Sequence, residues 1–96
     1  MMTFLARMKV KADKEEEFKR LAAILTEKVH ALEPETLNYQ FFKLRDEPLS
    51  YAVYEQFASE AAEEAHRNTA HFSELAPDLI DCIDGTYVRE FLDPMD

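Results

Sequence analysis

Glu55, His66 and His71 are the residues of this chain that are best suited to move a proton. An imidazole whose pKa lies near its ordinary value of about 6.5 can accept and return a proton at neutral pH. Glu55 interrupts an apolar stretch, where an ionised carboxylate must be paired or solvated. Its expected partner is either His66, which it would orient, or an arginine of the same sheet. Arg7 and Arg89 are the candidates for that ion pair.

The two histidines follow one another along segments of helical spacing. His66 lies beside Ala62 and Ala65 at the edge of an apolar stripe, so its ring can point into a pocket beneath the helix. A histidine that is merely packed or exposed fits the same pattern. His71 begins the next segment, where a neutral imidazole can cap backbone groups. With Glu55 the two histidines also form a three-ligand set, but a strand and a turn separate them, and we predict no metal site.

The motifs that the chain lacks exclude other kinds of chemistry. Gly85 is the only glycine, which rules out a glycine-rich phosphate loop, and no nucleophile elbow, HExxH or paired-cysteine motif occurs. Cys82 is the only cysteine, so the chain has no internal disulfide and no zinc signature. Catalysis would therefore rest on side chains alone.

The charge balance argues against two classes of partner. The 96 residues include 11 basic and 20 acidic side chains, a formal charge of -9, which repels phosphate backbones and anionic lipid surfaces. No apolar run is long enough to span a bilayer, and no basic leader precedes the first apolar stretch. We expect a cytoplasmic protein that binds neither nucleic acid nor membrane. We expect one domain over residues 1–96, with a short tail at 93–96 that is either flexible or in contact with a partner.

Apolar spacing predicts the elements that hold these residues, beginning with a strand and a helix. Residues 3–10 alternate between apolar and polar positions, which predicts a strand. Asp13 and Glu16 have the spacing of an N-cap and its capping-box partner, and Pro34 stops the helix that follows. The apolar stripe of that helix is Phe18, Leu21, Leu25, Val29 and Leu32.

A hairpin, two helical segments and a last strand are predicted for the rest of the chain. Strands at 36–44 and 51–57 flank a polar turn at 45–48. Ser59 can cap a helix, and a further helical run extends over 72–83. The apolar stripe of the first helix is Ala61, Ala62, Ala65 and Thr69.

A proline and a glycine should interrupt the regular structure towards the end of the chain. Pro77 should break or kink the second helical run. Gly85 follows the predicted helix, at a position where the chain needs a positive φ angle that glycine adopts readily. We predict the last strand at residues 86–92. The predicted order is therefore β-α-β-β-α-α-β, an α+β fold.

Both faces of the predicted sheet are apolar. One alternation phase holds Phe4, Met8, Leu37, Phe41 and Val53, and the other holds Leu5, Phe42, Tyr54, Tyr87 and Phe91. A second face that met water would carry polar residues instead. A second copy of the sheet is the simplest cover, because a two-fold pairing of identical patches closes on itself. We predict a homodimer through the sheet faces, with isolated exposed aromatics on a monomer as the alternative.

The segment from Tyr54 to Phe72 resembles the antibiotic biosynthesis monooxygenase family. Members commonly show E-x-aromatic followed by H-x-x-S/T-x-H, which is similar to the segments beginning at Glu55 and His66 here. The order of elements agrees over nearly the whole chain. The resemblance implies a ferredoxin-like fold with a four-stranded antiparallel sheet, two copies of which form a dimeric α+β barrel. It also implies a pocket between each sheet and its helices.

For many members the resemblance implies oxidation of a phenolic or quinol-like substrate by O2 without flavin, haem or metal, so no cofactor is expected. The deprotonated substrate would itself deliver an electron to oxygen. On that mechanism His66 would remove the proton and Glu55 would orient His66. Tyr54 and Asn38 would hold the ionised oxygen by hydrogen bonds. The implied substrate-binding set is Tyr54, Asn38, His71, Tyr39 and Arg89.

Other activities fit the same residues. A related branch isomerises a phosphorylated quorum-sensing dione without oxygen, and proton shuttling by histidine serves that reaction too. The phosphate would need two or more basic residues near the pocket. The candidates are Arg7, Lys43, Arg67 and Arg89. A non-catalytic small-ligand-binding module is a third possibility. Haem degradation is disfavoured, because haem-degrading relatives rely on a tryptophan and this chain has none.

Overall fold

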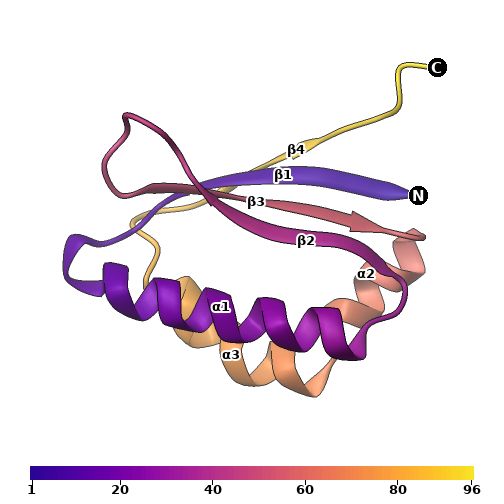
Figure 1. The fold of residues 1–96 in the computed structure, drawn as a ribbon, viewed down its shortest axis with the longest axis horizontal. Helices are drawn as coiled ribbons and strands as arrows, with labels where there is room; N and C mark the ends of the chain where they lie inside the picture. The colour runs from indigo at the N-terminus through magenta and orange to yellow at the C-terminus, as the bar shows by residue number, and fades with distance from the viewer.

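The computed structural model describes residues 1–96 and contains one four-stranded antiparallel sheet in the order β2-β3-β1-β4. The strands are β1 (Met2–Lys9), β2 (Thr36–Lys43), β3 (Ser50–Phe57) and β4 (Val88–Phe91). The helices are α1 (Glu15–Leu32), α2 (Glu60–Arg67) and α3 (Ala70–Asp81). All three helices cover one face of the sheet (Figure 1). This arrangement confirms the predicted α+β ferredoxin-like fold.

Strand β1 lies inside the sheet between β3 and β4 and shows the predicted alternation. Phe4, Ala6 and Met8 are buried on the helix side, whereas Arg7 and Lys9 are exposed. Ala6 lies opposite a β3 residue, Val53, and a β4 residue, Arg89. The strand register therefore brings side chains from three strands into one row beneath the helices.

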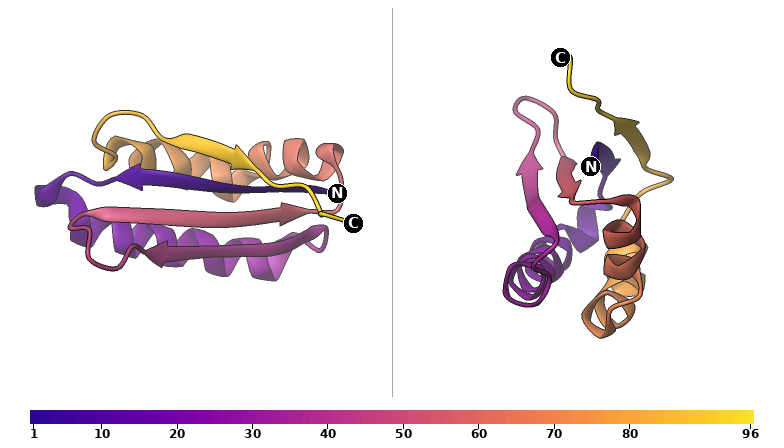
Figure 2. Two further views of the ribbon diagram at one scale, coloured as in Figure 1. Left: turned by 90° about the horizontal axis from the view of Figure 1, so that it is seen from above. Right: turned by 90° about the vertical axis from the view of Figure 1, so that its right-hand side faces the viewer.

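Helix α1 lies beneath the β2 side of the sheet, and α2 and α3 lie side by side beneath the other half (Figure 2). Helix α2 also contacts β2 and β3. The predicted stripe is buried except for Leu32, which is 60% exposed at the helix end. The predicted capping box is wrong, because a 3-10 turn at Ala12–Lys14 precedes the helix and no side chain caps it. Acidic residues in the first turn stabilise the start of the helix instead, because their charges lie near the positive end of the helix dipole.

Helix α2 begins as predicted but presents a different face to the sheet. The Ser59 hydroxyl accepts a hydrogen bond from the backbone N–H of Ala62 at 3.1 Å. The predicted stripe is wrong, because Ala61 and Ala65 are exposed. The buried residues are Ala62, Glu63 and His66. A polar side chain can be buried when it has a hydrogen-bonding partner, which an apolar stripe does not reveal.

Helix α3 runs without interruption through Pro77, so the predicted break there is wrong. The proline removes one helical hydrogen bond, and the carbonyl that loses it belongs to Ser73, which is exposed. The separation from α2 falls at Asn68 and Thr69 instead. The Thr69 hydroxyl caps α3 by accepting from the backbone N–H of Phe72 at 3.2 Å, a role that we had predicted for His71.

The second face of the sheet carries no helix (Figure 2). Its large apolar residues are Leu5, Phe42, Tyr54 and Val88. The predicted placement of Tyr87 and Phe91 on this face is wrong. Tyr87 lines a cavity on the helix side, and the Phe91 ring lies 5.6 Å from that of Phe4. Leu37 is half exposed rather than in the core, because the β2 register shifts between Thr36 and Asn38.

The turn before β4 contains the only glycine of the chain. Gly85 has a φ of +87°, which confirms the predicted positive backbone angle ahead of β4. No helix is both long and apolar enough to cross a membrane.

Candidate functional site

A cavity of about 70 Å3 lies between the helix side of the sheet and helices α2 and α3. Its lining is mostly apolar, and two alanines, Ala6 of β1 and Ala76 of α3, contribute to it. Five acidic, basic or imidazole side chains also reach the cavity: Glu55, Glu63, His66, Arg67 and Arg89. The site is therefore a small apolar space into which a few polar groups converge, as in a small-molecule site.

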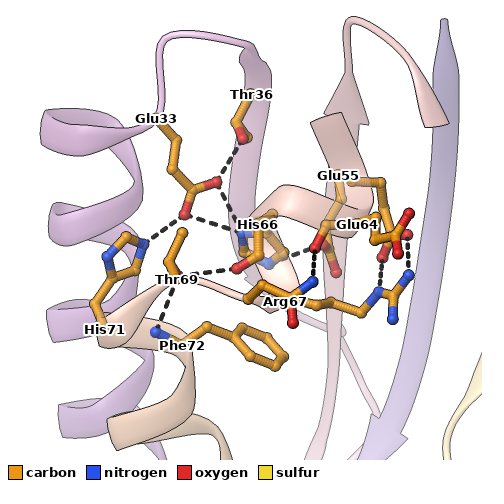
Figure 3. Close-up of polar contacts among 11 residues, drawn as sticks. Glu33, Thr36, Glu55, Glu64, His66, Arg67, Thr69, His71 and Phe72 are labelled. Atoms are coloured by element: carbon orange, nitrogen blue, oxygen red, sulfur yellow. Dashed lines mark hydrogen bonds and ion pairs between the residues drawn. The ribbon is translucent and has the colours of Figure 1, made fainter. Parts of the chain in front are cut away.

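The carboxylate of Glu33 joins three elements beside this cavity (Figure 3). It accepts hydrogen bonds from the Thr36 hydroxyl at 2.6 Å and from Nδ1 of His66 at 2.8 Å. Nε2 of His71 donates to its other oxygen at 2.5 Å. The side chain of Glu33 is 7% exposed. The beginning of β2, the end of α2 and the beginning of α3 are thus held together by one buried carboxylate.

Our sequence interpretation treated Glu33 only as part of a helix stop. One signal could have identified it, because Glu33 is the C-cap residue of α1. A carboxylate at a helix C-terminus is disfavoured by the helix macrodipole and needs donors from elsewhere. Burial raises the pKa of Glu33, but the hydrogen bonds from Thr36, His71 and His66 outweigh burial, and the net pKa is lowered. Glu33 is therefore ionised at neutral pH.

His66 is almost fully buried, with a side chain that is 2% exposed. Its ring packs among the aromatic rings of Tyr39, Phe57 and Phe72, at centroid distances of 5.4, 5.2 and 4.9 Å. Burial lowers the pKa of His66, and the hydrogen bond to Glu33 opposes that effect without reversing it. The imidazole is therefore neutral at pH 7 and able to accept a proton.

Glu55 faces the same cavity from β3, with a side chain that is 12% exposed. Its Oε1 lies 3.8 Å from Nε2 of His66, which is longer than a hydrogen bond. Burial raises the pKa of Glu55 to about 8, the charge of Arg89 opposes the shift, and Glu63 and Glu33 add to it. Glu55 is thus mostly protonated at neutral pH and can donate a hydrogen bond.

The structure separates the remaining predicted site residues. Tyr39 and Arg89 line the cavity. His71 contacts Glu33 and lies outside the cavity lining. Tyr54 and Asn38 lie on the opposite face of the sheet, where Asn38 donates to the Gln56 side chain at 2.7 Å. Side chains alternate along a strand, so adjacent residues such as Tyr54 and Glu55 cannot both face the cavity.

Most of the basic residues considered for a phosphate site already have partners. Arg7 pairs with Glu90 at 2.9 Å, where both side chains are about half exposed. Arg67 makes a two-point contact with Glu63 at 2.7 and 3.0 Å. Lys43 donates to the backbone carbonyl of Glu47. Arg89, which stacks on the Phe4 ring at 4.8 Å, is the basic residue of that group without such a contact.

The ferredoxin-like sheet, its three covering helices and the titratable cavity between them define the structural class of this protein. Within that class, the antibiotic biosynthesis monooxygenase family matches residues 1–77. The chain therefore belongs to the antibiotic biosynthesis monooxygenase family. A search of curated proteins found no match.

One solved structure supports the same assignment, and two others share the fold. A Caulobacter crescentus CB15 protein named for this family is 32% identical, with a TM-score of 0.91 over 99% of this chain and 90% of that one. A Nitrosomonas europaea protein named for the same family is 22% identical, with a TM-score of 0.89 and full coverage of both chains. A Mycobacterium tuberculosis protein is 17% identical, with a TM-score of 0.87 over 99% and 95% of the two chains. The last two show the shared fold alone.

Proposed function

We propose that this protein is a cofactor-independent monooxygenase that oxidises a small phenolic or quinol-like substrate with O2. The observation that carries the proposal is the pair of His66 and Glu55, a neutral imidazole and a protonated carboxyl 3.8 Å apart in an apolar cavity. Membership of the monooxygenase family supports the reaction class.

The first step is removal of the substrate proton. A single substrate oxygen can lie within hydrogen-bonding distance of both Nε2 of His66 and the carboxyl of Glu55, because those atoms are only 3.8 Å apart. The phenolic proton passes to His66, and Glu55 donates a hydrogen bond to the developing phenolate. Such a donor is most effective in a buried site from which water is excluded. Glu55 thus acts as a donor to the substrate in addition to lying beside His66.

The second step uses the electrons of the substrate. The phenolate transfers one electron to O2, and the resulting substrate radical and superoxide combine into a peroxide, which takes a proton from the His66 imidazolium. Loss of water from the carbon that bears the hydroperoxide leaves a carbonyl. One oxygen atom enters the product, the other leaves as water, and no external reductant is consumed. Tyr39 and Arg89, which line the cavity, would contact the substrate.

We place the enzyme in the cytoplasm as a homodimer. The apolar residues Leu5, Phe42, Tyr54 and Val88 leave the second sheet face open to a second copy of the same face. The isomerase alternative, which needs a phosphate site, receives less support. Two arginines line the cavity, and Arg67 is already paired with Glu63, which leaves Arg89 to bind a phosphate. A phosphate dianion would be expected to need more than one such residue.

Oxygen uptake tests the proposal. The purified protein is mixed in metal-free buffer with catechols, naphthoquinols and polyketide-like phenols, and uptake is followed with an oxygen electrode. We expect His66→Ala to lower the turnover rate by about 100-fold or more, the size of a lost general base. His30→Gln is the matched control, because His30 lies outside this cavity and contacts the backbone carbonyl of Tyr39, which an amide can also reach.

Two outcomes would contradict the proposal. Uniformly absent uptake by the unmodified protein would exclude the monooxygenase reaction. Full turnover by the His66→Ala protein would exclude His66 as the base. If uptake is absent while native mass spectrometry retains a bound small molecule, the result favours the non-catalytic binding module.

A further inference from the structure

We infer that Glu33 is the positioning residue of this site and that it holds the His66 proton on Nδ1, so that the bare Nε2 faces the cavity. The inference deepens the proposed function and rests on it for its catalytic meaning. The positions of Glu33, His66 and Glu55 carry the argument, because Nδ1 faces Glu33 at 2.8 Å and Nε2 faces Glu55 at 3.8 Å.

The hydrogen-bonding capacity of each group fixes the direction of the contact. An ionised carboxylate can only accept hydrogen bonds, and the donors around Glu33 keep it ionised. Nδ1 of His66 must therefore donate to it. A neutral imidazole has one N–H, so the proton on Nδ1 leaves a lone pair on Nε2. The base is thus aimed at the cavity before any substrate arrives.

Two further donors keep the Glu33 carboxylate in place. The Thr36 hydroxyl binds Oε1, the oxygen that lies closest to His66, and His71 binds Oε2. These donors come from β2 and α3, whereas His66 comes from α2. His71 and Thr36 thus act on the chemistry through the carboxylate, without touching the substrate cavity.

The same carboxylate stabilises His66 after it has taken a proton. The imidazolium formed in the reaction would be buried, where an unpaired charge is costly. Glu33 lies next to it and already accepts its Nδ1 proton. The imidazole therefore has a charged, fixed side and a reactive side that faces the substrate cavity.

NMR of the unliganded protein labelled with 15N-histidine tests the assignment without a substrate. Long-range 1H–15N correlations at pH 7 distinguish a protonated from a bare ring nitrogen. We expect His66 to carry its proton on Nδ1 in the unmodified protein. In Glu33→Gln the amide can donate to Nδ1, and we expect the proton to move to Nε2. Glu35→Gln is the matched control, because it makes the same substitution at an exposed carboxylate two positions along the chain.

An Nε2 proton on His66 in the unmodified protein would overturn the inference, even if Glu33→Gln failed to fold. An unchanged preference for Nδ1 in a folded Glu33→Leu protein, whose side chain offers no acceptor to His66, would also overturn it. Where a substrate is available, Glu33→Gln should lower kcat by about 100-fold or more with little change in KM, while Glu33→Asp recovers part of the loss. Since the NMR result needs no substrate, it can fail or succeed independently of the monooxygenase reaction.

Discussion

Nε2 of His66 lies 3.8 Å from Oε1 of Glu55, and both side chains are largely shielded from water. Burial lowers the pKa of His66 and raises the pKa of Glu55 to about 8, so at neutral pH both groups are uncharged. The pair therefore combines a proton acceptor with a hydrogen-bond donor. A substrate oxygen between them could lose its proton and have its new charge stabilised at the same time.

This pair predicts a bell-shaped dependence of kcat/KM on pH. The rate should rise through a pH below the ordinary His66 pKa of 6.5, because the base must be neutral. It should fall near pH 8, because Glu55 then ionises, stops donating and repels the phenolate. Initial rates of oxygen uptake between pH 5 and pH 10 would check both limbs.

Glu55→Gln should remove the alkaline limb while keeping the rate at pH 7 within about tenfold, because an amide donates at every pH. Glu63→Gln is the matched control. The charge of Glu63 raises the pKa of Glu55, so its removal should retain the alkaline limb and move it to lower pH. An alkaline limb that persists unchanged in Glu55→Gln would show that another group titrates there.

Burial of Glu55 also predicts how stability changes with pH. The folded-state pKa of about 8 is above the ordinary value of 4.5, so between these values the folded state binds more protons than the unfolded state. Stability should then fall as pH rises from about 5 to 8, by up to about 1.4 kcal/mol per pH unit. Urea unfolding of the wild type and Glu55→Gln should show a flatter pH dependence for the variant; parallel curves would contradict the raised pKa.

The size of the cavity should decide what can bind. Ala6 lines it and is 2% exposed, so Ala6→Val directs two methyl groups into the space. We expect binding of catechol, followed by NMR titration, to weaken about tenfold or more, with a destabilisation of at most about 1–3 kcal/mol. Ala22→Val, a core substitution in α1 outside the cavity, should leave catechol affinity unchanged. Equal affinities in all three proteins would place the binding site elsewhere.

The sheet face that carries no helix predicts a dimer, and a single charged residue placed on that face should weaken it. Leu5 lies on this face opposite Tyr54, so Leu5→Glu would bury a charge between two copies. Sedimentation velocity should show a dimer for the wild type and a shift toward monomer for the variant. Ala31→Glu, on the exposed surface of α1, should sediment like the wild type. A wild-type monomer at micromolar concentration would exclude this interface.

The helix that carries His66 depends on its cap. Ser59 satisfies the backbone N–H of Ala62, so Ser59→Ala should destabilise the protein by about 1 kcal/mol. Urea unfolding monitored by circular dichroism would measure the change. Ser73→Ala, at an exposed position inside α3, should have a much smaller effect. Equal stabilities of the two variants would show that the cap contributes nothing.

Much of the fold could be read from periodic patterns. The alternation in β1 and the stripe of α1 reflect burial of apolar side chains, which repeats with the geometry of each element. Pro77 and Asp13 show where local rules failed. Helix α3 continues through Pro77 with one helical hydrogen bond fewer, and a 3-10 turn replaces the cap that Asp13 would have formed. Local signals predict element types better than element boundaries, because packing decides the ends.

The sequence by itself determined the residue types of the site, since His66 and Glu55 stand out by chemistry and by a family pattern. Only the tertiary structure decided how they are arranged. It brings Glu33 to His66 across 33 positions of the chain, and it turns Tyr54 and Asn38 to the other face of the sheet. The reason is physical: a hydrogen bond between distant segments leaves no periodic trace in the sequence. The raised pKa of Glu55 likewise comes from burial by helices and strands that meet only in the folded protein.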